Sequence, residues 1–248
     1  MENFTLSCPY AFLKRDSSVL VLVFSCMENV HSNAPYKFGY YKYASAAFPE
    51  QDILFLQDWK GAVWYTSSCD ALRAELAVVV LRSKYAHVFC VGHSSGGFAA
   101  FLVAAHLPNF KGAYVLAAQG CLAHLMTLPI EGDVHKHLSE ELSHYYNSRD
   151  DLVRPLAHLP RNLPDGCIAW EYNPLCPTDS ALALHGSSCV LEREHTWPAS
   201  VKTIPFAVEG ASTHYDSIMA RIEGNWLLTH AAPHLQALLS TFAREGID

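Results

Sequence analysis

The sequence is poor in charged residues, and the basic ones are not gathered in one place. Only 17% of the 248 residues are charged, below the roughly 25% of typical soluble domains. The formal net charge is −7, with 17 basic and 24 acidic side chains and no cluster of Lys and Arg. Nucleic acids and anionic membranes bind through such clusters, so neither is an expected partner. We expect a small, weakly charged partner instead.

The sequence also has no long apolar run. The longest runs, 19–24 and 76–81, are far shorter than the roughly 20 residues of a membrane-spanning helix. Among the first residues, Glu2 comes early and Lys14 and Arg15 come late, which reverses the charge order of a secretory signal. We therefore expect no transmembrane segment and a location in the cytosol.

Common metal and redox motifs are missing as well. Eight cysteines are spread through apolar stretches without any CxxC pair, which argues against zinc ribbons and thioredoxin-like sites. We expect them to be mostly buried, reduced thiols. The 14 histidines include no HExxH pattern, and His135 and His137, two residues apart, would point to opposite sides of a helix. Neither a metal ion nor a cofactor is expected.

Short apolar runs alternate with segments of helical periodicity. In the segment 70–82, for example, Leu72, Leu76, Val79 and Val80 share one face of a helix. Near-continuous apolar runs are typical of strands that are covered on both faces. The runs span 18–25, 52–57, 87–91, 113–118, 167–172 and 202–208. The alternation predicts an α/β fold with a mostly parallel sheet flanked by helices.

The chain shows no internal repeat and no Gly/Ser-rich linker, so we expect one domain over residues 1–248. The interval 119–166 is the exception to the regular alternation. It lacks a convincing strand and ends in the proline-broken stretch 154–164. An insertion of this size predicts a small helical cap or lid over the carboxyl edge of the sheet, where α/β proteins bind ligands.

The motif that carries chemistry is Gly-His-Ser-Ser-Gly-Gly at 92–97, between a predicted strand and a predicted helix. This GxSxG pattern in a strand–turn–helix context is typical of a nucleophile elbow with Ser94 at its tip. Gly92 and Gly96 lack a Cβ and let neighbouring backbone pass closely. The N–H of Ser95 at the helix start is positioned to bind an oxyanion. The alternative is a glycine-rich turn that only joins strand to helix.

These residues resemble the α/β-hydrolase family of serine esterases, lipases and thioesterases. In that family the acid follows a late strand and the histidine follows the last one. The resemblance implies Asp179 as the acid and His214, in a loop before the helical run 218–228, as the base. Alternatively, Asp179 caps a helix over 180–185 and His214 is a solvated loop residue. Less suitable candidates are Asp165, Glu171, His185, His195 and His230.

The family commonly carries His-Gly after its first central strand, followed by a residue whose N–H completes the oxyanion hole. Here Ser25-Cys26 takes that place, so Met27 is the implied donor, and the Cys restricts the backbone. The order of FSC at 24–26, LFLQD at 54–58 and WY at 64–65 resembles small bacterial members of the family. Predicted substrate contacts are Cys26, His93, Tyr36 and Trp64, although the aromatic residues of 33–48 and 58–65 equally suit packing of the core.

The sequence thus predicts a serine hydrolase that cleaves an ester or thioester through an acyl-enzyme on Ser94. The expected substrate is a small acyl compound, free or linked to a carrier. An acyltransferase would use the same acyl-enzyme with a different acceptor. A catalytically silent binding module is the alternative from another class, because a fold does not fix a function.

Overall fold

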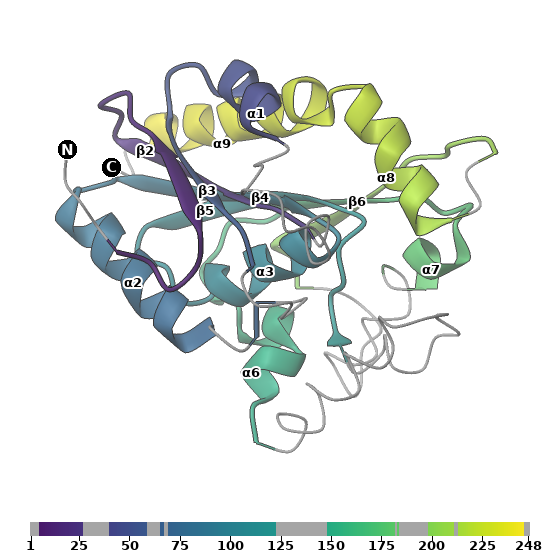
Figure 1. The fold of residues 1–248 in the computed structure, drawn as a ribbon, viewed down its shortest axis with the longest axis horizontal. Helices are drawn as coiled ribbons and strands as arrows, with labels where there is room; N and C mark the ends of the chain where they lie inside the picture. Colours follow the sequence, from purple (N-terminus) through teal and green to yellow (C-terminus); the bar gives the residue numbers. More distant parts are fainter. Residues whose placement is uncertain are drawn as a thin grey trace.

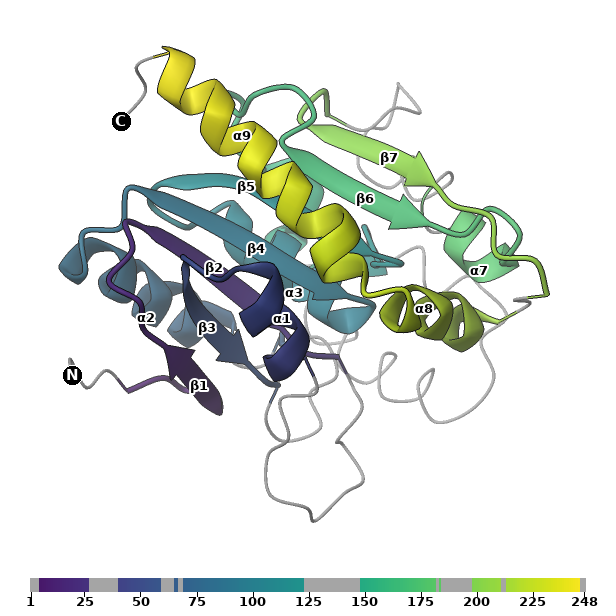
Figure 2. The same cartoon turned by 90° about the horizontal axis from the view of Figure 1, so that it is seen from above.

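A computed structural model describes residues 5–26, 40–58, 65–66, 69–122, 148–181, 183, 198–210 and 213–245. Its centre is a seven-stranded sheet in the order β1-β3-β2-β4-β5-β6-β7 (Figures 1 and 2). The strands are β1 (Tyr10–Leu13), β2 (Val19–Phe24), β3 (Asp52–Leu56), β4 (His87–His93), β5 (Phe110–Leu116), β6 (Ile168–Tyr172) and β7 (Val201–Pro205). β1 pairs antiparallel with β3, and all other pairs are parallel. The predicted α/β fold with a mostly parallel sheet is confirmed.

Helices cover both faces of the sheet (Figure 1). On one face lie α2 (Cys69–Arg82), α3 (Ser95–Ala104), α6 (Asp150–Val153) and the 3-10 turn η1 (Pro155–His158). On the other lie α1 (Tyr41–Ala47), α8 (His214–Glu223), the π-helical turn η4 (Leu227–Ala231) and α9 (Ala232–Glu245). Figure 2 shows α9 lying over the sheet, oblique to the strands. The double cover explains why every residue of β2, β3 and β6 is buried.

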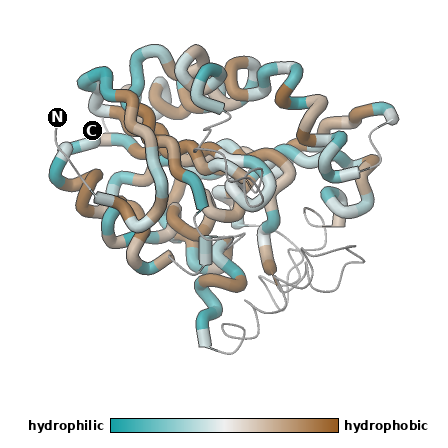
Figure 3. The backbone as a smooth tube through the Cα atoms, in the orientation of Figure 1, coloured by the Kyte–Doolittle hydropathy of each residue, from teal (hydrophilic) through white to brown (hydrophobic). Residues whose placement is uncertain are grey.

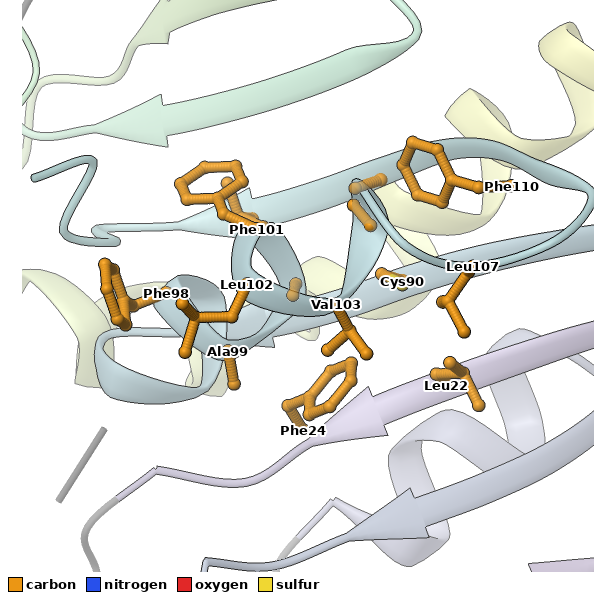
Figure 4. Close-up of a cluster of buried hydrophobic side chains, with 14 of the residues drawn as sticks. Leu22, Phe24, Cys90, Phe98, Ala99, Phe101, Leu102, Val103, Leu107 and Phe110 are labelled. Atoms are coloured by element: carbon orange, nitrogen blue, oxygen red, sulfur yellow. The ribbon is translucent and has the colours of Figure 1, made fainter. Parts of the chain in front are cut away.

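The helix α3 is buried along its whole length. Its residues Phe98, Phe101 and Val103 point into the same cluster as Leu22 and Phe24 of β2 (Figure 4). Burying a large apolar side chain stabilises a fold by about 1.5–3 kcal/mol. Because α3 begins immediately after Ser94, this packing also fixes where the predicted nucleophile lies.

Hydrophobic residues are concentrated in the strands and in the helix faces that pack on them (Figure 3). Of the seven described cysteines, only Cys26 is not buried, and none of the seven is in a disulfide. Burial raises the pKa of Cys8, Cys69 and Cys167 to about 12, so these thiols are neutral at pH 7. The eighth cysteine, Cys189, lies outside the described residues.

Some elements differ from the prediction. The strand β1 and the long helix α9 were not predicted, β4 continues to His93, and β7 ends at Pro205 rather than at residue 208. Of the predicted cap, the structure describes 119–122 and 148–166, which contain α6 and η1. The cap and the single domain therefore stay predictions. Within the described ranges no helix is both long and apolar enough to cross a membrane.

Candidate active site

Ser94 lies at the tip of a sharp turn between β4 and α3. Its backbone angles are φ 49° and ψ −126°, a positive-φ conformation that side-chain-bearing residues rarely adopt. The N–H of Ser94 donates to the carbonyl of Leu116 on β5 at 2.9 Å, and its carbonyl accepts from Phe98 N–H at 3.1 Å. The turn is thus held between the neighbouring strand and the first turn of the helix.

The glycines of the motif are required by close backbone approaches. A Cβ on Gly92 would lie 2.3 Å from the carbonyl oxygen of Gly96, and a Cβ on Gly96 would lie 2.4 Å from that of Phe24. A Cβ on Gly97 would meet the Cβ of Ala118 at 2.6 Å. The predicted steric role of Gly92 and Gly96 therefore has a direct cause, and Gly96 places the elbow directly against the carboxyl end of β2.

His214 is the first residue of α8, so the prediction that it lies in a loop ahead of the helix is wrong. The cause is an N-cap that begins the helix four residues earlier than residue 218. Thr213 Oγ1 accepts from the backbone N–H of Asp216 at 3.1 Å, and its hydroxyl donates to Asp216 Oδ2 at 2.7 Å. Thr at the N-cap with an acidic residue three positions later was visible in the sequence.

Asp179 lies in the short helix α7 (Pro177–Ser180), after the carboxyl end of β6. Because α7 begins at Pro177, the alternative that Asp179 caps a helix over 180–185 is wrong. The side chain is fully buried, and its Oδ1 lies 2.5 Å from Nδ1 of His214. Within the described residues its second oxygen, Oδ2, has no hydrogen-bond partner. The imidazole is therefore the partner toward which this carboxylate is directed.

The structure brings Ser94, His214 and Asp179 into one hydrogen-bonded series. Ser94 Oγ lies 2.9 Å from Nε2 of His214, whose other nitrogen faces Asp179. The three residues follow β4, β7 and β6, which are parallel and end at the same edge of the sheet. The His214 side chain is 27% exposed, whereas that of Asp179 is not exposed at all. A buried carboxylate that orients an imidazole next to a hydroxyl is the arrangement that activates a serine.

The other candidates for acid and base lie elsewhere. Asp165 precedes β6, at the opposite end of the strand from Asp179. Glu171 lies within β6, is buried, and contacts Tyr114 Oη, Arg221 Nε at 3.2 Å and His230 Nδ1 at 3.1 Å. This cluster lies under α8 and η4 and anchors them to the sheet. The remaining histidines in question, His185 and His195, lie outside the described residues.

His93, which precedes the nucleophile, is 1% exposed. Its Nε2 lies 2.9 Å from the hydroxyl of Tyr40, and the two rings meet edge to face with centroids 4.9 Å apart. Burial, together with the nearby His214, lowers the pKa of His93 to about 3. A neutral imidazole therefore lies behind the nucleophile, in contact with protein groups.

One of the two predicted oxyanion donors lies in the described part of the chain. Ser95 is the first residue of α3, where backbone N–H groups have no acceptor within the helix and the helix dipole favours negative charge. The second donor, Met27, lies outside the described residues. Tyr65 fixes the backbone at the end of β2, because its hydroxyl donates to Ser25 O at 2.9 Å and to Leu56 O at 3.1 Å. Of the two roles that the sequence allowed for Tyr65, substrate contact and packing, the structure therefore supports packing.

The predicted substrate contacts are only partly described. Tyr36 and Trp64 lie outside the described residues, and Cys26, after β2, is half-buried. Among the described aromatic residues of the segment 33–48, Tyr40 and Phe48 are buried, whereas Tyr41 and Tyr43 on α1 are exposed. Substrate contact stays a prediction for Cys26 and His93. Searched over the described residues, the chain contains no group of three His, Cys, Asp or Glu side chains that could hold a metal ion.

Sequence reasoning missed two buried residues beside Asp179 and His214. Asn173 directly follows β6, and Ser217 lies on α8, one turn after His214. Both are fully buried, and their side chains are hydrogen-bonded to each other. The NP pair at 173–174 predicts a turn, but no local pattern predicts its contact with Ser217, 44 residues away.

Comparison with known proteins gives matches at the level of structure only. No family model and no curated protein matches the sequence. Esterase B from Lactobacillus rhamnosis is similar at a TM-score of 0.60 and 14% identity, over 95% of this chain and 82% of that one. The capsule O-acetyltransferase of Neisseria meningitidis serogroup A gives 0.54 and 15%, over 90% and 94%. Carboxyl esterase 2 from Tuber melanosporum gives 0.55 and 13%, over 92% and 77%.

These similarities extend over nearly the whole of this chain. At such identities a structural likeness bears on the fold and leaves the substrate open. The chain has the α/β-hydrolase fold.

Proposed function

We propose that this protein is a serine hydrolase that cleaves an ester or thioester through an acyl-enzyme on Ser94. The observation that carries the proposal is the hydrogen-bonded series from Ser94 Oγ through His214 to Asp179, with distances of 2.9 Å and 2.5 Å. A serine hydroxyl is a weak nucleophile at neutral pH, and a base within hydrogen-bonding distance is what activates it. Nothing else in the described part of the chain places a base against Ser94.

In the first half-reaction, Nε2 of His214 takes the Ser94 proton while Oγ attacks the acyl carbonyl. The negative charge that develops on the carbonyl oxygen is stabilised by the N–H of Ser95 and, as the sequence predicts, by that of Met27. Asp179 holds the imidazole in the required tautomer and stabilises the imidazolium. His214 then gives its proton to the leaving alcohol or thiol, and the acyl group stays on Ser94.

In the second half-reaction, His214 takes a proton from water, and the resulting hydroxide attacks the acyl carbonyl. The proton returns to Ser94 Oγ as the carboxylic acid leaves, so the enzyme ends as it began. The neutral state of His93 suits this cycle, because a second positive charge beside His214 would oppose formation of the imidazolium.

An acyltransferase is the second candidate. The capsule O-acetyltransferase with the same fold supports it, since that protein moves an acyl group rather than releasing it. The first half-reaction would be unchanged, and an alcohol or amine would replace water in the second. A binding module that uses the fold without catalysis is less favoured, because it has no need of an aligned serine, histidine and aspartate.

The proposal is tested with a fluorophosphonate probe, which forms a covalent bond with an activated serine. We expect labelling of the wild-type protein, an adduct on Ser94 by peptide mass spectrometry, and no labelling of Ser94→Ala. Ser95→Ala is the matched control, because it removes the neighbouring hydroxyl and keeps the backbone N–H. Equal labelling of Ser94→Ala and the wild type would show that Ser94 is not the nucleophile.

Hydrolysis and acyl transfer are separated by the products. A p-nitrophenyl ester and an acyl thioester are each supplied as donor, first in buffer alone and then with added alcohols and amines. A hydrolase releases the carboxylic acid under all conditions, whereas a transferase releases little acid and forms a new ester or amide. A preference between the two donors decides between ester and thioester.

A further inference from the structure

A buried polar contact joins the loop that carries Asp179 to the helix that carries His214. Nδ2 of Asn173 donates to Oγ of Ser217 at 2.9 Å, and both residues are fully buried. Asn173 directly follows β6, and Ser217 lies one turn beyond His214 on α8. The contact therefore links the two elements whose spacing sets the distance between Asp179 and His214.

Each side chain also fixes the backbone of its own element. The Ser217 hydroxyl donates to the carbonyl of Thr213 at 3.0 Å, which is the residue immediately before His214. The amide oxygen Oδ1 of Asn173 accepts from the N–H of Leu175 at 3.0 Å, which shapes the loop leading to α7. A displacement of either element would break bonds on both sides of the contact.

Cys176, the N-cap residue of α7, extends this network toward Asp179 through its backbone. Its N–H donates to the carbonyl of Asn173 at 3.1 Å, and its carbonyl accepts from the N–H of Ser180 at 2.9 Å. The side chain is fully buried, and burial raises the pKa of the thiol, so it places no second charge beside the carboxylate of Asp179.

The distance between Asp179 and His214 is the quantity that such a network protects. The Oδ1–Nδ1 distance is 2.5 Å, and a hydrogen bond to a charged group weakens steeply as its geometry departs from the optimum. The network is shielded from solvent, so water does not replace its hydrogen bonds at the same positions. Misplacement of a catalytic group by about 1 Å is enough to cost about 10²-fold in rate.

We propose that Asn173 and Ser217 are positioning residues that hold the Asp179 loop and the start of α8 in register, so that His214 stays aligned with Ser94. This inference rests on the proposed function, because it assigns the network to the same three residues. Neither residue touches a substrate in this role. Their effect is carried to Ser94 through the orientation of the imidazole.

The test compares Ser217→Ala with Ser240→Ala. Each serine donates its hydroxyl to the backbone carbonyl four residues earlier, Ser217 to Thr213 and Ser240 to Gln236 at 2.8 Å. Ser240 is the control because it lies on α9, away from the site. For Ser217→Ala we expect kcat for a p-nitrophenyl ester to fall about 10- to 100-fold with KM within twofold. Ser240→Ala should leave both parameters within twofold. The loss of kcat in the combined Asn173→Ala/Ser217→Ala variant should be smaller than the product of the two single losses, because the contact that the two side chains share is lost only once.

A second measurement does not depend on activity. The proton between His214 Nδ1 and Asp179 gives a far-downfield NMR signal, assigned by its absence in Asp179→Asn. We expect Ser217→Ala to broaden or remove this signal and Ser240→Ala to retain it. Should Ser217→Ala fail to fold, Ser217→Cys replaces it, since a thiol fills the same space and is only a weak acceptor for the Asn173 amide.

The outcomes separate the two proposals. An unchanged kcat and an unchanged downfield signal in folded Ser217→Ala or Ser217→Cys would overturn the positioning role while leaving the hydrolase intact. A wild-type protein without hydrolysis and without probe labelling would contradict the proposed function. In that case the downfield signal alone decides whether Asn173 and Ser217 position His214, and its persistence in the variants rejects that role.

Discussion

The hydroxyl of Tyr40 lies 2.9 Å from Nε2 of His93, which joins the start of α1 to the residue before Ser94. The imidazole is buried, and its other nitrogen, Nδ1, has no hydrogen-bond partner among the described residues. Burial first, and the nearby His214 second, lower the pKa of His93 to about 3. This histidine is therefore neutral over the whole range in which unfolded histidines titrate.

A pH dependence of stability follows from this pKa. Below pH 6.5 the unfolded chain protonates His93 and the folded chain does not, so acid favours unfolding by about 1.4 kcal/mol per pH unit. We expect the free energy of unfolding to fall less steeply between pH 6.5 and pH 4 in His93→Gln than in the wild type. Urea unfolding at several pH values measures this. Equal slopes in the two proteins would contradict a neutral, buried His93.

The carboxylate of Asp179 should control the rate rather than substrate binding. Asp179→Asn keeps the size of the side chain but favours the wrong tautomer of His214, and in a Ser-His-Asp protease the same change lowers kcat by about 10⁴-fold. We expect a loss of that order here, with KM changed little. Steady-state kinetics with a p-nitrophenyl ester gives both values. The control is Asp165→Asn, at the opposite end of β6, and a comparable loss in that variant would argue against a specific role for Asp179.

Replacement of Gly96 should disrupt the elbow. The Cβ of Gly96→Ala would lie 2.4 Å from the carbonyl oxygen of Phe24 and 2.9 Å from that of Ser25, so the backbone must shift. We expect probe labelling of Ser94 to be lost and the melting temperature to fall. Gly224→Ala is the control, because its nearest contact at 3.5 Å is an ordinary van der Waals distance. Full labelling of Gly96→Ala would show that the elbow still forms when Gly96 and the end of β2 lie farther apart than in the structure.

The ion pair between Glu171 and Arg221 should contribute to stability far more than a surface pair. Arg221→Met leaves a fully buried carboxylate without its guanidinium, and loss of one partner of a buried pair costs about 3–5 kcal/mol. Because Arg221 is partly exposed, we expect a value near the lower end of that range. Lys14→Met, which removes an exposed pair with Asp16, should cost less than about 1 kcal/mol. Chemical denaturation measures both, and equal losses would reject the anchoring role.

The parts of the fold that depend on local sequence could be predicted. The apolar runs identified six of the seven strands, and the glycines around Ser94 identified the elbow, because each is determined by nearby residues. The strand β1 has only four residues, and none of them is fully buried, so it lacks the long apolar run of a covered strand. It forms a strand because it pairs with β3. The start of α8 was missed because the apolar pattern was given more weight than the cap formed by Thr213.

The contacts that join distant parts of the chain could not be predicted in this way. Asn173 and Ser217, like Glu171 and Arg221, meet only because β6 and α8 pack together, and neither pair follows a local pattern. The positions of Asp179 and His214 were expected from the family resemblance, which supplies long-range information that a single sequence lacks. The distances between these residues and Ser94 depend on how β4, β6 and α8 pack, and that packing is determined by the whole fold.

The order of the strands along the chain has a consequence for the newly synthesised protein. Ser94 follows β4, whereas its hydrogen-bond partner His214 comes 120 residues later, after the edge strand β7. During synthesis the elbow can form on β2, β4 and β5 well before α8 exists. In the proposed mechanism the hydroxyl of Ser94 then has no base, so we expect a partly made chain to be unreactive toward esters in its surroundings. We expect reactivity to appear only when the last third of the chain docks.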